Sequence, residues 1–195
     1  MTSAREIFTD PKLRCGGFYE LSIQFSRAEG TDIISLYKQY LWELQTVSGP
    51  YDEEFNRSPW ESDACREEGI FRIGAKTVPF KTHYFKEIEA TDVCWFDVAL
   101  YTATVENVFQ DQLASSNRQP YVPRELHDFL IQLMKGFFII HPFQLSYIGL
   151  ETAQEYHLEQ FKASGLLPLE YLHFFMPRNQ FVDILPAYHK MVTAL

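Results

Sequence analysis

Alternating hydrophobic and polar residues predict β-strands along the chain. Residues 18–25 carry hydrophobic side chains at every second position and polar side chains between them, as in a strand with one buried face. The same alternation predicts strands over residues 70–80 and 143–150. Residues 93–105 are hydrophobic on both faces apart from Asp97, which is typical of a central strand that is covered on both sides.

Hydrophobic residues spaced three and four apart predict two longer helices. The first begins after Thr31 or Asp32, either of which can cap it, and ends before Gly49. The second begins at Pro123, because proline is favoured in the first turn of a helix, and it ends before His141. Shorter helices are predicted over residues 151–163 and 186–194, and a hairpin over residues 170–176 and 181–185.

The two halves of the chain contain similar short segments. FYELSIQF at residues 18–25 resembles FQLSYIGL in the second half, and WFDVAL at residues 95–100 resembles FVDIL near the end. These similarities suggest two pseudo-repeats, residues 18–140 and 143–195, that share one core.

The predicted elements follow the order βαββα and then βαββα again. The first six, βαββαβ, also match a ferredoxin-like unit. A length of 195 residues suits one large domain. The prediction is therefore a single compact α+β domain over residues 1–195, with an antiparallel or mixed sheet and helices packed on one of its faces.

The charge balance of the chain is acidic. There are 26 acidic and 17 basic side chains, which gives a formal net charge of -9. Nucleic acids and anionic membranes both attract positively charged surfaces, so we expect neither as a partner. Hydrophobic residues make up 46% of the chain, which is enough to build a core.

Cysteine usage and hydropathy indicate a cytoplasmic protein. Cys15, Cys65 and Cys94 are widely spaced, which argues against a disulfide framework and a zinc site. The hydrophobic run at residues 137–140 is far shorter than the roughly 20 residues of a membrane helix. Residues 1–17 contain no apolar stretch of signal-peptide length. We therefore expect a soluble protein of the cytoplasm.

Residues 48–69 form a long polar segment that holds much of the charge. Seven acidic and two basic residues give it a net charge of -5, so the rest of the chain contributes -4. Long loops are often functional, and aromatic side chains among charged ones are typical of binding hot spots. Alternatively, these aromatic side chains fold back and cover the core. The candidate binding residues are Tyr51, Glu53, Glu54, Phe55 and Trp60.

Two aspartates lie in segments that are otherwise hydrophobic. Asp97 interrupts a predicted strand, and Asp183 has a similar place near the end of the chain. A buried carboxylate needs a partner, so we expect either an ion pair across a sheet face or a general acid or base in a cleft. In the second case, His83 and His141 are the histidines that would join Asp97 in a catalytic site. Cys94 is expected to be a small hydrophobic residue of the core.

The sequence contains no motif for a cofactor, metal or phosphate site. The histidines lack the HxH, HxxxH and HExxH spacings, and the GxSxG, GxxxxGK[ST] and GxGxxG motifs are absent. We therefore expect no cofactor and no metal.

Taken together, these patterns favour a non-catalytic acidic protein-interaction module over an enzyme. Its specific form would be an inhibitor or immunity-type protein that binds a basic protein. Two alternatives stay open. One is a small hydrolase or transferase that uses Asp97 and a histidine, and the other is a homo-oligomeric structural protein that pairs a sheet edge across a two-fold axis.

Overall fold

The computed structural model describes residues 3–26, 32–61, 64–86, 93–113, 123–150, 156–163 and 172–195. The strands are β1 (Phe18–Ser26), β2 (Val47–Ser48), β3 (Arg66–Ile73), β4 (Lys76–Lys86), β5 (Val93–Tyr101), β6 (Leu145–Leu150), β7 (His173–Met176) and β8 (Val192–Ala194). The helices are α1 (Ala4–Thr9), α2 (Ile33–Glu43), α3 (Thr102–Val108), α4 (Gln110–Leu113), α5 (Arg124–Ile140), α6 (Leu158–Lys162), α7 (Arg178–Phe181) and the 3-10 helix η2 (Pro186–Tyr188).

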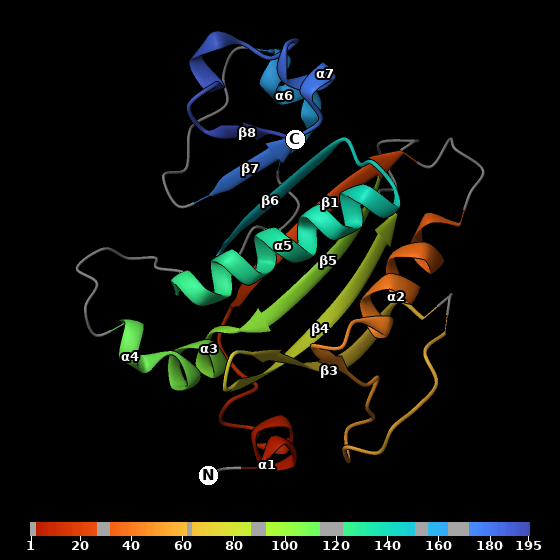
Figure 1. Cartoon of the computed structure of the whole chain (residues 1–195), viewed down its shortest axis with the longest axis vertical. Helices are drawn as coiled ribbons and strands as arrows, with labels where there is room; N and C mark the ends of the chain where they lie inside the picture. The colour runs from red at the N-terminus through yellow and green to blue at the C-terminus, as the bar shows by residue number, and fades with distance from the viewer. Residues whose placement is uncertain are drawn as a thin grey trace.

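The strands form one mixed sheet in the order β2-β3-β4-β5-β1-β6-β7-β8 (Figure 1). The pair β7 and β8 is parallel, and the other neighbours are antiparallel. The fold is therefore α+β with a mixed sheet, as the sequence predicts. Strand β5 is buried on both faces, which confirms the prediction of a central strand, and Cys94 lies in the core.

Helices α2 and α5 cover one face of the sheet (Figure 1). Helix α2 begins where the carboxylate of Asp32 accepts a hydrogen bond from the backbone N–H of Ser35 at 3.1 Å. The ring of Tyr37 packs on that of Phe137 from α5, with centroids 5.1 Å apart. The two longer predicted helices are thus confirmed. The buried residues of α5 are Leu126, Leu130, Leu133, Met134 and Phe137.

Helix α6 and the C-terminal segments pack on the opposite face. Successive side chains of a strand point to opposite faces. Accordingly, Ile148 and Phe175 belong to the core under α2 and α5, whereas Tyr147 and Phe174 belong to a second core together with Phe161 of α6. Helices therefore lie on both faces of the sheet, and not on one as predicted, because β6 and β7 carry hydrophobic residues on both sides.

Strand β1 is buried on both faces, although its alternating pattern predicts one exposed face. Ser22 and Gln24 are its buried polar residues. The side-chain nitrogen of Gln24 lies 3.1 Å from Nδ1 of His157, and its oxygen accepts a hydrogen bond from the backbone N–H of Leu158 at 3.2 Å. Gln24 is thus a polar residue that hydrogen-bonds within the protein, to the start of α6, and does not contact solvent.

Residues 70–80 form a hairpin and not the single strand that their alternation predicts. Strands β3 and β4 are joined through Gly74, whose φ of 59° is a left-handed conformation that glycine adopts without strain. Strand β3 begins already at Arg66, inside the segment predicted as a loop. Strand β5 ends earlier than predicted, at Tyr101, where the chain turns into α3.

The C-terminal region differs most from the prediction. The proposed second arm of the hairpin, residues 181–185, forms the end of α7 and a turn, and Asp183 is exposed in that turn. Residues 186–194 are not one helix but η2 followed by β8, because the end of the chain pairs with β7.

Of the helix predicted over residues 151–163, only residues 158–162 are helical and form α6. Residues 156, 157 and 163 are described but not helical, and residues 151–155 lie outside the described residues. Neither the βαββα order nor a ferredoxin-like or repeated arrangement is confirmed. None of the helices in the described segments has the length and hydrophobicity needed to span a membrane.

Candidate functional site: an acidic hollow beside strand β3

A hollow of about 490 Å³ lies where the segment after β2 meets the start of β3. Its size falls within the range of roughly 300–1,000 Å³ that is common for ligand pockets. Five carboxylates and one guanidinium line it, so its wall is strongly acidic. The lining residues are Pro50, Tyr51, Asp52, Glu53, Ser58, Pro59, Glu61, Ala64, Arg66, Glu67 and Glu68.

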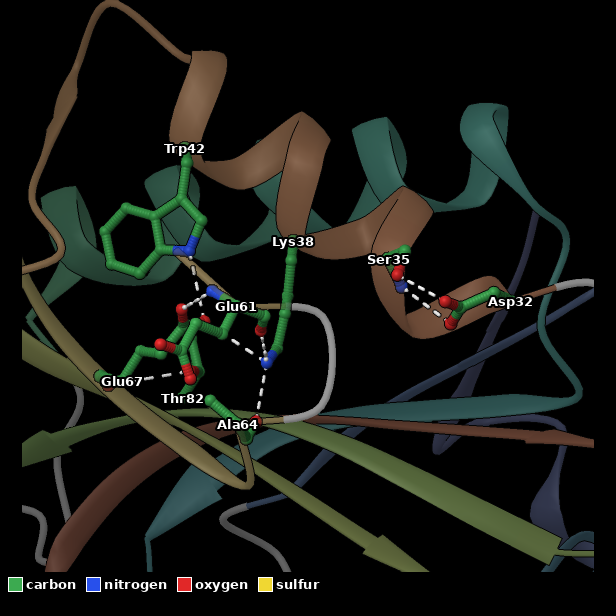
Figure 2. A network of polar contacts seen from close by, with 8 residues as sticks. All are labelled: Asp32, Ser35, Lys38, Trp42, Glu61, Ala64, Glu67 and Thr82. Carbon is green, nitrogen blue, oxygen red and sulfur yellow. Dashed lines mark hydrogen bonds and ion pairs between the residues drawn. The ribbon is translucent and has the colours of Figure 1, made fainter. Parts of the chain in front are cut away.

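The inner wall of the hollow is attached to α2 through Lys38 (Figure 2). Lys38 is only 1% exposed, and its ammonium lies 3.3 Å from Oε2 of Glu67. The ammonium also donates hydrogen bonds to the backbone carbonyls of Glu61 at 2.7 Å and Ala64 at 2.5 Å. A buried charge requires such partners. Lys38 therefore holds the backbone of Glu61 and Ala64 and the carboxylate of Glu67 in place.

The carboxylate of Glu67 is occupied by contacts within the protein. Its Oε2 accepts a hydrogen bond from the indole Nε1–H of Trp42 at 3.2 Å, and its Oε1 accepts one from the backbone N–H of Glu61 at 3.0 Å. Figure 2 shows Trp42 and Lys38 reaching Glu67 from successive turns of α2. Glu67 is therefore a structural acid, whose charge Lys38 balances.

Two arginines share the carboxylate of Glu68. Arg14 pairs with Oε2, and Arg66 pairs with Oε1. The Arg14 side chain is 18% exposed and its guanidinium lies 5.3 Å from the centroid of the Phe8 ring, whereas the Arg66 side chain is 50% exposed. Arg14 is thus the firmly held partner, and Arg66 is the one that can leave at small cost.

The rim of the hollow is shaped by Asp52. Its Oδ1 accepts backbone hydrogen bonds from Glu54 at 3.0 Å and from Asn56 at 2.7 Å. The bond from the Asn56 backbone, followed by one from the Asn56 side chain, holds the pKa of Asp52 below its usual value. Asp52 therefore stays ionised in mildly acidic solution.

Two of the predicted aromatic residues connect this rim to α1. The rings of Tyr51 and Phe55 are stacked with centroids 4.2 Å apart. Phe8 of α1 is buried against both of them, at 5.7 Å from Tyr51 and 5.1 Å from Phe55. Tyr51 thus lines the hollow, whereas Phe55 is not among the lining residues and packs against Tyr51 and Phe8.

The remaining predicted binding residues lie on the surface around the hollow. Glu53 lines it, and Glu54 is exposed beside it in the chain. Trp60 follows the lining residue Pro59 and is 37% exposed. Among the ion pairs of the described residues, none involves Glu53 or Glu61, so these two carboxylates remain available to a partner. The carboxylate of Asp52 is instead occupied by hydrogen bonds from Glu54 and Asn56.

The anchoring role of Lys38 is a feature that the sequence did not lead us to predict. One signal was present, since Lys38 lies between Ile34 and Leu41 on the hydrophobic face of α2. A lysine at such a position is buried with its helix face and must have an acidic or carbonyl partner.

A second polar cluster crosses the sheet on the face opposite α2 and α5. His83 of β4 and Ser22 of β1 lie directly opposite Asp97 of β5, and Tyr147 of β6 lies opposite Ser22. Asp97 is 3% exposed. The structure thus brings together two of the three residues predicted for a catalytic site.

Burial, with additional repulsion from Lys81 and Arg66, lowers the pKa of His83 to about 4. Burial also raises the pKa of Tyr147, and the charge of Asp97 adds to this effect. At neutral pH, His83 is therefore a neutral imidazole and Tyr147 an un-ionised phenol.

His141 lies apart from this cluster. It caps the C-terminal end of α5, and its backbone carbonyl accepts a hydrogen bond from the hydroxyl of Tyr37 at 2.9 Å. Tyr37 belongs to the core under α2 and α5, so His141 is on the other side of the sheet from His83. The predicted meeting of all three residues in one cleft is therefore wrong.

The described residues contain no group of three or more side chains suited to hold a metal ion. Comparisons of the chain with family models, with curated proteins and with solved structures gave no match.

Proposed function

We propose that the chain is a protein-interaction module that binds a basic segment of another protein in the acidic hollow. An inhibitor or immunity-type protein that neutralises a basic partner is the specific form of this proposal. The observation that carries it is the combination of a hollow of about 490 Å³ with the carboxylates of Glu53 and Glu61 in its wall, which form no ion pair with other described residues.

The partner is a lysine or arginine side chain presented by a protein surface. A cation that enters the hollow meets several carboxylates at once. Trp60, which follows the lining residue Pro59 in the chain and is 37% exposed, is the aromatic residue that we expect to add a cation–π contact. Charge concentrated in one segment also steers a basic partner toward this side of the molecule. Because the carboxylates are exposed, salt weakens the attraction.

Arg66 acts in this proposal as an internal competitor. It occupies Oε1 of Glu68 with a half-exposed side chain, at a point where an incoming guanidinium would bind. An arginine of the partner replaces Arg66, while Arg14 keeps Oε2.

The test is a calorimetric titration with a short oligo-arginine peptide, with an oligo-glutamate peptide of equal length as the negative probe. We expect binding of the basic peptide that weakens as salt is raised. Replacing both Glu53→Gln and Glu61→Gln weakens binding by about two- to thirtyfold, since exposed ion pairs are each worth about 0.2–1 kcal/mol. Arg66→Gln strengthens binding, because it opens Oε1 of Glu68.

Matched variants separate the hollow from overall charge. Glu159→Gln on α6 removes one exposed negative charge and Arg178→Gln on α7 removes one exposed positive charge, and neither residue lines the hollow. Both should leave the affinity nearly unchanged. If they change it as much as the variants in the hollow do, binding depends on net charge alone and the proposal is wrong.

The register of β4 and β5 favours a second candidate function, a small hydrolase or transferase. His83 and Asp97 lie directly opposite each other, and a neutral imidazole beside a carboxylate can serve as a general base. The low pKa of His83 makes it a weak base, and for this reason we place the interaction module first.

A further inference from the structure

Two histidines from distant parts of the chain meet at the C-terminal edge of the sheet. His127 lies in the first turns of α5, and His173 begins β7. Nε2 of His127 is 3.2 Å from Nδ1 of His173, and the two ring planes are inclined by only 20° with centroids 5.4 Å apart, so the rings meet edge to edge through these nitrogens. This is the geometry of an imidazole pair that shares one proton.

Thr193 of β8 extends the pair into a chain of three side chains. Its Oγ1 is 2.9 Å from Nε2 of His173. Strand β8 pairs in parallel with β7, and just beyond it the backbone N–H of Leu195 donates to the carbonyl of Met176 at 2.9 Å. The imidazole of His173 therefore connects α5 on one side with the terminal strand on the other.

The pair is stable only while one of the facing nitrogens carries no proton. If both rings are protonated, two N–H groups and two positive charges face each other across 3.2 Å. The charged group of the described residues that acts on the pair is the carboxylate of Asp128 on α5, which favours protonation of His127. The groups contributed by β7 and β8 are uncharged, namely the ring of Phe175 at 4.1 Å from that of His173 and the hydroxyl of Thr193.

We propose that His127 and His173 form an acid-sensitive latch that fastens β7 and β8 to helix α5 and opens when both imidazoles are protonated. Opening separates α5 from His173, loosens the bond to Thr193 and frees the last strand of the sheet. The edge of β7 then becomes available for pairing with another strand. The latch is independent of the acidic hollow, which lies at the opposite end of the sheet order.

The direction of the pH effect follows from the folded state. Burial lowers the pKa of both histidines, and the neighbouring His127 lowers that of His173 further, to about 4, from an ordinary value of 6.5. A histidine with a lowered folded pKa stabilises the fold fully above its unfolded pKa. That stability is lost as pH falls from 6.5 toward 4.

Hydrogen exchange at about pH 7 and about pH 4.5, corrected for the intrinsic exchange rate, tests the latch. We expect protection of β7 and β8 to fall at least about tenfold in acid, with β1 and β5 still protected. The glutamine of the His173→Gln variant cannot be protonated in this range, and only His127 is left to titrate, so the edge strands should lose clearly less protection in acid than those of the wild type. His189→Gln, which removes an exposed histidine nearby, should behave like the wild type.

Equal acid loss of protection in His173→Gln and wild type would overturn the latch. If His173→Gln already lacks protection at neutral pH, the ring titrations of the wild-type histidines decide by nuclear magnetic resonance. If the pKa values of His127 and His173 are lowered and depend on each other, the latch is supported. If the two rings titrate independently with pKa values near 6.5, the latch is contradicted.

Discussion

At the scale of single residues, the most consequential position is Lys38. Its ammonium is buried with Glu67 and two backbone carbonyls, in a region that the hydrophobic pattern alone would fill with an aliphatic side chain. A buried pair adds little net stability, but removing one member leaves an uncompensated charge. Lys38 therefore fixes the position of the acidic wall more than it strengthens the fold.

Lys38→Ala should lower the free energy of unfolding by about 3–5 kcal/mol, because the charge of Glu67 is then buried alone. Chemical denaturation measures this loss. The double variant Lys38→Met with Glu67→Gln should recover at least half of it, since the amide still accepts from Trp42 and no charge is left. A loss below about 1 kcal/mol in Lys38→Ala would show that Glu67 is solvated and that the pair does not hold the wall.

At the scale of elements, Gly69 of β3 sets how closely α2 approaches the sheet. The rings of Trp42 and Phe80 are stacked, with centroids 5.5 Å apart. A Cβ atom at Gly69 would lie 2.6 Å from Cζ3 of Trp42 and 2.9 Å from Cε1 of Phe80. The missing side chain thus makes room for the indole that binds Glu67.

Gly69→Ala should destabilise the fold by about 1–3 kcal/mol, because the added methyl group overfills a packed site. The shift in denaturation midpoint measures this cost. Combining Gly69→Ala with Trp42→Phe, which shortens the opposing ring system, should cost less than the sum of the two single changes. Strict additivity of the two changes would contradict this packing.

The elements that the sequence predicted well are those whose pattern is set by one buried face. Helices α2 and α5 are of this kind, because their hydrophobic spacing directly records the core. Strand β5 was predicted from a different pattern, a run that is hydrophobic on both faces, and it is buried on both. The position of strand β1 was predicted correctly. The prediction that one of its faces is exposed was wrong, since the polar residue Gln24 on that face is buried. Strand β8 could not be predicted from the sequence, because its three residues, Val192–Ala194, form a strand only by pairing with β7.

Part of the candidate site could be predicted from the sequence, because composition is a local property of a segment. Charge and aromatic content mark the segment around Tyr51 and Glu53, whatever its conformation. The hollow itself depends on contacts between residues far apart in sequence, such as Arg14 with Glu68 and Lys38 with Glu67. No local pattern encodes such pairs.

At the scale of the whole molecule, the sheet separates two hydrophobic cores, and the acidic loop lies apart from the C-terminal strands. Helices α2 and α5 build the larger core on one face, α6 and the C-terminal segments build a second core on the other, and the acidic loop lies beside β3 (Figure 1). Residues 48–69 contribute -5 of the net charge of -9, and the acidic hollow that this segment lines is near one end of the sheet, away from the His127–His173 pair at the other.

The most direct test of the central claim is a map of backbone amide shifts in the isotope-labelled chain during titration with the oligo-arginine peptide. The account predicts that the largest changes cluster at residues 51–61 and 66–68, around the hollow. Changes centred on His83 and Asp97 would instead favour the catalytic alternative. Changes scattered over the acidic surface, or none at all, would contradict a built site for a basic partner.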